Sequence, residues 1–344
     1  MIKEIAVAQA IFNKIQTAQH ILVITHQNPD GDGLGALSAL AQYLQSINKD
    51  YQLFCRDLAP PNYQFLPRLH QLISDPLIFS KQTFDLIIVL DTSSLDYAGI
   101  EEMLRPLPKA PARQYTGTGG GDQPLAEVSY PYTLVNIDHH LTNNNFGQLN
   151  LVQNTASSAS EIIYDLLRLW QVAITKEIAT ALLNGIIFDT GAFSNAATSL
   201  YSLQVASHLL NLGARHKEIN ENILRNKSLS LLKLWGIAFE RLVYNEKYQV
   251  AFTVLTLDDF RIYNVEPEAA AGLSNFFNEL AGAKVILVLT EPEEGLIKGS
   301  LRTTTDEVDV GKLVQKWGGG GHKKAAGFSL KGKLVYNEGR WQIR

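Results

Sequence analysis

Short apolar runs that stop at polar turns recur along the first half of the chain. Residues 21–24, 84–90 and 133–137 are nearly continuous in apolar residues, and residues 51–55 predict a further strand. Runs of this kind are typical of parallel strands that are covered on both faces. We therefore expect an α/β fold whose first domain contains a mostly parallel sheet.

Apolar residues at helical spacing precede, separate and follow these runs. The pattern predicts helices over residues 1–19, 33–47, 157–170, 175–188 and 200–212. Residues 219–242 have the same periodicity, and Gly213 before them acts as a stop. We expect this long helix to connect two domains.

The pattern changes from Tyr248 onward and predicts a second, smaller α/β domain. Its expected elements are strands over residues 249–255, 284–290 and 296–302, helices near 267–280 and 310–317, and a closing strand. The predicted organisation is a first domain over residues 1–213, a helical linker over 214–242 and a second domain over 243–344.

Acidic and imidazole side chains follow the three apolar strands, and one helix end adds a further acid. These residues are His26, Asp30, Asp32, Asp91, Asp138, His139, His140 and Asp189. Because ligands bind beyond the carboxyl ends of parallel strands, we expect these side chains to converge. Such a set is large enough for two divalent ions about 3.5–4 Å apart, with one bridging carboxylate. Imidazole and carboxylate without thiolate favour Mn²⁺ over Zn²⁺, with Mg²⁺ the weaker competitor.

Composition and charge limit the partners. The 344 residues have the make-up of an ordinary globular protein and a net charge of −4, which argues against long duplex nucleic acid. The single cysteine, Cys55, excludes an intrachain disulfide and fits a reducing compartment. No secretory pattern opens the chain, and no apolar run approaches the roughly 20 residues of a membrane span. We expect a cytoplasmic protein without a membrane partner, and the sequence leaves a homodimer open.

Each polar motif also has a simpler interpretation when it is taken alone. Asp30 and Asp32 would then belong to a polar turn, Asp91 would cap a helix, and Asp189 would end one. The four glycines before His322 would be a flexible helix stop. The position of these motifs at successive strand ends favours a shared site instead.

Five motifs in order resemble those of a known family. The segment HQNPDGDGLGA from His26, the strand end at Asp91, the triplet Asp138-His139-His140 and the segment FDTGAF around Asp189 resemble the four motifs of the DHH phosphoesterases. The segment GGGGHKKAAG resembles the signature of the DHHA1 domain that accompanies them. The resemblance covers nearly the whole chain and is greatest to the bacterial nanoRNase group. Members of that group are exonucleases on very short RNA and phosphatases on 3′-phosphoadenosine 5′-phosphate.

The resemblance implies two Mn²⁺ sites that share Asp91. The first would use His26, Asp30 and Asp91, and the second would use Asp32, Asp91, His139 and Asp189. Water activated between the ions would be the nucleophile. His140 would face the substrate phosphate as a catalytic residue, and Asp138 would orient a histidine.

The resemblance also assigns substrate-binding residues to the second domain. Arg302 would grip a phosphate, and the glycine-rich segment would bind another phosphate or a ribose oxygen. The segment contributes Gly319, Gly320, Gly321 and His322. Closure of the two domains would limit substrate length. Two departures stand out, because Ala36 replaces a serine of many relatives and the insertion over residues 105–125 is long.

The expected function is a Mn²⁺-dependent phosphoesterase that hydrolyses small nucleotides or short oligonucleotides from an end. Three alternatives stay open. Cyclic or linear dinucleotides are substrates within the same chemistry. A family II inorganic pyrophosphatase shares the first-domain motifs, although its second domain lacks the glycine-rich His signature. A non-catalytic nucleotide-binding module is a candidate of a different class.

Overall fold

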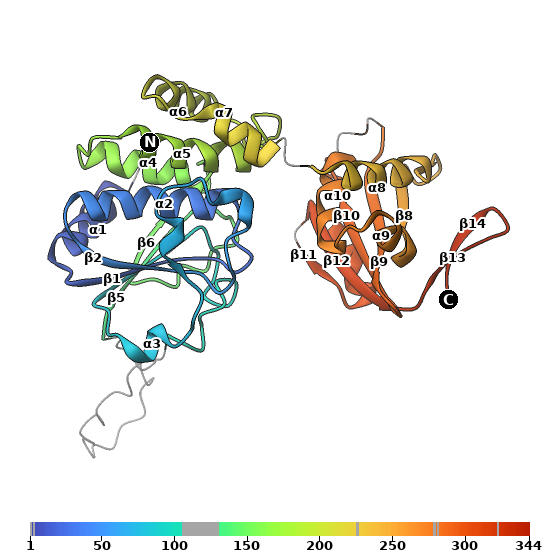
Figure 1. Cartoon of the computed structure of the whole chain (residues 1–344), viewed down its shortest axis with the longest axis horizontal. Coiled ribbons are helices and arrows are strands. Elements are labelled where there is room, and N and C mark those ends of the chain that lie inside the picture. The colour runs from blue at the N-terminus through green and yellow to red at the C-terminus, as the bar shows by residue number, and fades with distance from the viewer. Residues whose placement is uncertain are drawn as a thin grey trace, which may run out of the picture. The chain divides into compact units, whose positions relative to one another are not determined.

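The computed structural model describes residues 2, 4–104, 131–224, 227–277, 280, 282–321 and 323–344. The predicted insertion over residues 105–125 lies outside these described residues. The chain forms two compact units, Met1–Asn226 and Lys227–Arg344 (Figure 1). No helix in the described part of the chain is long and apolar enough to cross a membrane.

A six-stranded parallel sheet forms the centre of the first unit, so the predicted α/β fold with a parallel sheet is confirmed. Its strands, in spatial order, are β3 (Leu72–Ile73), β2 (Asp50–Phe54), β1 (His20–Thr25), β4 (Leu86–Leu90), β5 (Thr133–Asp138) and β6 (Leu149–Val152). The strand order reverses between β1 and β4, which is the point where open α/β sheets bind their ligands.

Helices and loops cover both faces of this sheet. The helices are α1 (Ile5–Thr17), α2 (Gly31–Ser46), α3 (Ile78–Lys81), α4 (Ala159–Leu169), α5 (Lys176–Asp189), α6 (Leu200–Asn211) and α7 (His216–Ile219). Helices α1, α2, α4 and α5 lie on one side of the sheet, and α3 lies on the other (Figure 1). In β1, Ile21 and Val23 join the cluster under the long helices, whereas Leu22 and Ile24 join the opposite cluster. This double burial explains why the strands are apolar at every position.

Helices α2 and α5 pack with their backbones in contact. A methyl group on Gly35 would lie 2.6 Å from the carbonyl oxygen of Ala181 and 3.1 Å from the amide nitrogen of Gly185. Asn184 donates from Nδ2 to the carbonyl oxygen of Gly31 over 2.8 Å. The start of α2 is thereby held beside the last turns of α5.

The predicted continuous helix over residues 219–242 is wrong. Helix α7 ends at Ile219, a π-helical turn covers Asn220–Leu224, and α8 (Leu229–Glu240) begins afresh. Ser228 caps α8 by accepting a hydrogen bond from the Leu231 N–H over 3.1 Å, which stabilises a helix start at this point. The inward face of α8 belongs to the hydrophobic core of the second unit.

The second unit contains a mixed six-stranded sheet. Its strands, in spatial order, are β11 (Gly320–Gly321), β12 (Ala325–Lys331), β10 (Leu296–Arg302), β9 (Val285–Glu293), β8 (Val250–Leu255) and β7 (Val243–Asn245). Only β8 and β9 pair in parallel. Helices α9 (Leu257–Tyr263), α10 (Ala271–Phe277) and α11 (Val310–Val314) complete the unit, with a separate hairpin of β13 (Leu334–Asn337) and β14 (Arg340–Ile343). The prediction of a smaller α/β domain is confirmed.

A buried ion pair ties α9 to the end of α8. Asp259 accepts hydrogen bonds from the Arg241 guanidinium at 2.5 and 2.9 Å and from the Thr256 N–H at 2.7 Å. Burial opposes ionisation of this carboxyl, but the bonds from Arg241 and Thr256 outweigh it and lower the pKa of Asp259. The ionised form therefore stabilises the folded second unit.

Replacement of Asp259 by asparagine should lower the free energy of unfolding by about 2 kcal/mol at pH 7, because bonds to a charged group are lost. The pKa of Asp259 is lower in the folded than in the unfolded state. The stabilisation is thus complete above the unfolded pKa of about 3.9 and disappears as the pH falls through the native value. Urea unfolding followed by tryptophan fluorescence reports mainly on this unit, since three of the four tryptophans, Trp235, Trp317 and Trp341, lie in it.

The exposed neighbour Asp258 provides the matched control. Its side chain is 78% exposed and pairs with Arg261 only at 3.6 Å. Asp258→Asn should change the free energy of unfolding little, as is usual for a surface pair. Equal effects of the two substitutions, or an Asp259→Asn effect that does not decrease as the pH falls below about 3.9, would contradict the role given to the Asp259–Arg241 pair.

Candidate metal centre

The register of β1, β4 and β5 places the predicted site residues that follow these strands side by side at the carboxyl edge of the sheet. Thr25 of β1 pairs with Leu90 of β4, and Leu90 pairs with Ile137 of β5. The residues that come next in the three strands are His26, Asp91 and Asp138. The side chains therefore meet at the carboxyl edge of the sheet, at the reversal of strand order.

The first group of ligand atoms comes from His26, Asp30 and Asp91. His26 Nε2 lies 3.7 Å from Asp30 Oδ1 and 3.6 Å from Asp91 Oδ2. His26 Nδ1 lies 2.7 Å from the carbonyl oxygen of Gln27, which can only accept, so Nδ1 carries a proton. In the neutral imidazole Nε2 then has its lone pair available for a metal.

The second group comes from Asp32, His139 and Asp189. His139 Nε2 lies 3.0 Å from Asp189 Oδ2 and 3.5 Å from Asp91 Oδ1. Within each group the ligand atoms are no more than 4.8 Å apart. Asp91 thus presents one carboxylate oxygen to each histidine, and its position fits a carboxylate shared by two cations.

Two buried atoms at this centre have no hydrogen-bond partner among the described residues. They are Asp91 Oδ1 and His139 Nε2, which lie within ion-pair distance of each other at 3.5 Å, with Asp189 Oδ2 3.0 Å from His139 Nε2. An unsatisfied buried polar atom costs roughly 1–3 kcal/mol. A cation coordinated by these atoms would remove that cost, so the residues present fit a metal site.

The electrostatics of the cluster also call for positive charge. Burial raises the pKa of Asp32 well above its usual value, and the carboxylates of Asp91 and Asp189 raise it further. Burial likewise raises the pKa of Asp189 to about 6. Burial alone would lower the pKa of His26, but Asp30 and Asp91 outweigh it and raise the pKa to about 12. Protons on the imidazoles, or divalent cations in their place, balance the clustered acids.

Two helix N-termini hold the acidic side chains of α2. Asp30 caps α2 itself, since Oδ1 accepts from the Asp32 N–H at 2.9 Å and the Gly33 N–H at 3.2 Å. Asp32 accepts from the Ala159 N–H at 2.5 Å and from the Ser160 N–H at 2.9 Å, both in the first turn of α4. A helix N-terminus favours an anion at this place. The role of α4 was missed from the sequence, although the pair Ser158 and Glu161 predicts a helix start there.

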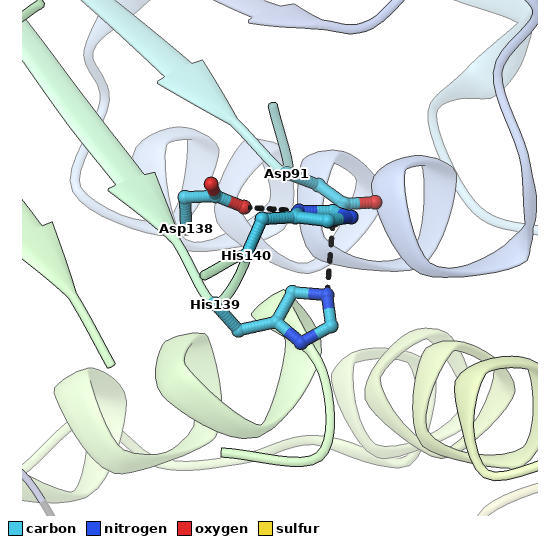
Figure 2. A group of neighbouring side chains, drawn as sticks. All are labelled: Asp91, Asp138, His139 and His140. Carbon is cyan, nitrogen blue, oxygen red and sulfur yellow. Dashed lines mark hydrogen bonds and ion pairs between the residues drawn. The ribbon is translucent and has the colours of Figure 1, made fainter. Parts of the chain in front are cut away.

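His140 is oriented by a chain of hydrogen bonds through Asp138 and Asn143. Figure 2 shows Asp138 directed at the His140 ring, and the distance from Asp138 Oδ1 to His140 Nδ1 is 2.7 Å. Asn143 Nδ2 donates to the other oxygen of Asp138 at 2.6 Å and to the carbonyl oxygen of Thr92 at 3.0 Å. His140 is 38% exposed, so its ring is accessible beside the buried ligands. Asn143 is a site residue that the sequence pattern did not identify.

The predicted substrate-binding residues of the second unit lie at one end of its sheet. Arg302 and Gly321 flank β12, because they pair with Ala325 and Ala326 respectively. Arg302 is half-buried. The Gly319 N–H donates to the carbonyl oxygen of Val314 at 3.0 Å, so this group is engaged within the unit. Gly320 is exposed, and His322 lies outside the described residues. Their part in substrate binding stays a prediction.

Gly33 allows α2 to begin against the metal centre. A methyl group at this position would lie 2.2 Å from Thr25 Oγ1 and 3.3 Å from both His26 Nε2 and Asp91 Oδ2. Gly33→Ala should therefore displace these side chains and weaken the binding of a divalent cation by this centre at least about tenfold, the lower bound for disturbed partners of metal ligands. Isothermal titration of the metal-depleted protein with Mn²⁺ measures the change.

Gly236 of α8 is the control for this substitution. A methyl group there would meet no atom within 4 Å. Gly236→Ala should leave Mn²⁺ affinity unchanged and stabilise α8 by roughly 0.5–1 kcal/mol through helix propensity. Unchanged Mn²⁺ binding by Gly33→Ala would show that this region does not form the metal site.

Comparisons with known proteins identify both units. Residues 20–107 match the family model of the DHH family, N-terminal domain, and residues 247–339 match the DHHA1 domain. Over 315 residues the chain is 29% identical to a Thermus thermophilus protein named bifunctional oligoribonuclease and PAP phosphatase NrnA. The aligned region spans 91% of this chain and 84% of that protein.

Solved structures show the same fold. An exopolyphosphatase-related protein from Bacteroides fragilis aligns with a TM-score of 0.81 at 21% identity, over 95% of this chain and 92% of that chain. The exonuclease RecJ, solved with bound manganese, aligns with a TM-score of 0.50 at 14% identity, over 96% of this chain and 91% of that chain. The resemblance indicated by the sequence motifs is therefore confirmed. The chain therefore carries a DHH-family N-terminal domain and a DHHA1 domain.

Proposed function

We propose that the chain is a metal-dependent phosphoesterase that hydrolyses small nucleotides, or short oligonucleotides from an end. One observation carries the proposal: a buried Asp91 carboxylate presents one oxygen to each of two histidines, His26 and His139. Asp91 belongs to the first group of ligand atoms and lies 3.5 Å from His139 of the second group. Two adjacent groups of this kind are expected for a pair of divalent ions. The DHH-family N-terminal domain of the chain supports the same chemistry.

The proposed cofactor is a pair of Mn²⁺ ions, with Mg²⁺ as a weaker substitute. His26, Asp30 and Asp91 would hold one ion, and Asp32, Asp91, His139 and Asp189 would hold the other. Imidazole and carboxylate donors without thiolate suit Mn²⁺, and the RecJ structure was solved with manganese. When bound, two such ions polarise a phosphate and lower the pKa of water.

The chain's own residues supply the remaining chemistry. The hydrogen bond that His140 Nδ1 donates to the Asp138 carboxylate raises the pKa of His140, although burial opposes it. With its Nδ1 proton held by Asp138, the partly exposed imidazole can deliver a proton from Nε2 to a leaving ester oxygen. Asp138 itself is fully buried and acts by orienting His140. In the second unit, Arg302 and Gly319 to His322 are proposed to bind phosphate or ribose oxygens.

The substrate class follows from the relatives. The Thermus thermophilus protein is named for oligoribonuclease and PAP phosphatase activities, and it aligns over most of both chains. A Mn²⁺-supplemented assay should compare a dinucleotide, a 24-mer, 3′-phosphoadenosine 5′-phosphate and pyrophosphate. We expect fast turnover of the dinucleotide or of 3′-phosphoadenosine 5′-phosphate and slow turnover of the 24-mer. Faster hydrolysis of pyrophosphate would favour a pyrophosphatase, and nucleotide binding without hydrolysis would favour a non-catalytic module.

Asp91→Asn should reduce kcat/KM on the preferred substrate by more than 100-fold at saturating Mn²⁺. Asparagine keeps the size of the side chain and tolerates the positive φ of 57° at this position, but it removes the shared charge. Mutation of residues that support metal ligands lowers metal affinity or activity roughly 10- to 100-fold. Loss of a ligand shared by two ions should lower activity more. Asp50→Asn, at the exposed amino end of β2, should keep wild-type activity. Near-normal turnover by Asp91→Asn would falsify the two-metal assignment.

Asn143→Ala should lower kcat roughly 10- to 100-fold while leaving KM and Mn²⁺ affinity near wild type. The substitution removes the donor that fixes Asp138, and thereby the orientation of His140, without touching a metal ligand. Steady-state kinetics together with Mn²⁺ titration measure the three quantities. Asn144→Ala, at the exposed neighbouring position, is the control. An equal loss of Mn²⁺ binding would instead assign Asn143 a structural role in the whole centre.

A further inference from the structure

An exposed aromatic ring lies against a buried ligand of the candidate metal centre. The Tyr97 ring stacks on His26, with ring centroids 5.3 Å apart and an interplanar angle of 18°. Tyr97 is 47% exposed, whereas His26 is only 4% exposed. One face of the tyrosine is thus covered by the imidazole, and much of the rest of the ring is open to solvent.

Two hydrogen bonds hold the backbone of Tyr97 in place, while its ring rests on His26. The Tyr97 N–H donates to Ser94 Oγ at 3.1 Å, and its carbonyl oxygen accepts from the Gln27 N–H at 3.4 Å. These contacts join the segment after β4 to the residue that follows His26. A tyrosine fixed in this way offers a rigid flat surface at little cost in conformational entropy.

A cationic side chain borders the same segment. Arg56 follows the end of β2 and is exposed. A methyl group on Gly99, two residues after Tyr97, would lie 3.3 Å from Arg56 Cγ and 3.2 Å from Gln27 Oε1. The stem of Arg56 therefore lies beside the Tyr97 segment. Tyr97, Arg56 and Gln27 form what we call the Tyr97 rim, at the adjoining carboxyl ends of β4, β2 and β1.

We propose that the Tyr97 rim binds one nucleotide of the substrate, with Tyr97 stacking on the base and Arg56 pairing with a phosphate. A base has a π-face that stacks on an aromatic ring whatever its sequence, and a guanidinium matches phosphate oxygens. Inorganic phosphate and pyrophosphate have no such face. Because the rim adjoins a metal ligand, this inference rests on the proposed function and deepens it, by making the substrate a base-bearing nucleotide.

Equilibrium binding tests the rim without relying on turnover. The full chain should bind adenosine 5′-monophosphate about tenfold more tightly than ribose 5-phosphate, the size expected for one base stack. Tyr97→Leu should abolish that difference, while Tyr97→Phe should retain it. Arg56→Gln should weaken both ligands by the same factor, and Arg168→Gln, exposed in the last turn of α4, should weaken neither. Equal affinities of the wild type for the two ligands would overturn the proposal.

Kinetics separate base recognition from mere support of His26. A dinucleotide and its analogue lacking one base should be compared in the wild type, Tyr97→Leu and Tyr97→Phe. Tyr97→Leu should raise KM about tenfold for the complete dinucleotide and leave the abasic analogue unchanged. An equal rise in KM for both substrates would show that the Tyr97 ring only supports His26. That result would overturn the proposal that the Tyr97 rim binds a base. If the wild type hydrolyses neither substrate, the proposed function is contradicted. The binding measurement then still shows whether the Tyr97 rim recognises a base.

Discussion

The first unit gathers four carboxylates and two imidazoles at one sheet edge, where His26, Asp32 and Asp91 are almost completely buried and Asp30, His139 and Asp189 are partly buried. Ionised carboxylates removed from water cost several kcal/mol each unless they are paired or hydrogen-bonded. Each acid here has a hydrogen-bonding or ion-pair partner. Asp30 and Asp32 accept backbone N–H bonds at the starts of α2 and α4. Asp91 faces His26 and His139, and Asp189 faces His139. The fold supplies partial compensation, and cations would complete it.

Close packing of two helices determines where these acids can meet. Gly35 and Gly185 let the backbones of α2 and α5 touch, and Gly185 itself leaves only 2.5 Å between an added methyl group and Asp32 Oδ1. Any side chain at these positions would separate the helices. Asp32 at the start of α2 and Asp189 at the end of α5 would then no longer share a ligand group. The glycines of the first motif therefore serve the geometry of the site more than the flexibility of a loop.

Local patterns predicted most of the fold and the residues that lie together at the carboxyl edge of the first sheet. The apolar runs ending at Thr25, Leu90 and Ile137 mark parallel strands, and the rule that such strands end at one edge brings together His26, Asp91 and His139. Strands β3 and β6 were missed, because they are short and only partly buried. The break between α7 and α8 was missed because apolar periodicity continues across it, while the Ser228 cap is a single local signal. Asn143 and Tyr97 could not be identified, since their roles depend on contacts that close only in three dimensions.

The side chains at the candidate metal centre fall into a buried group and a solvent-exposed group. His26, Asp32 and Asp91 are almost completely buried, so substitutions there disturb packing, charge and ligation together. Tyr97 and His140 reach solvent directly beside them. If these two residues meet the substrate as proposed, a change at either of them alters substrate contacts without exposing a buried carboxylate. Relatives with the same ligand set can therefore differ in substrate through their exposed neighbours, and the ligand motifs alone identify the reaction class and not the molecule that is cleaved.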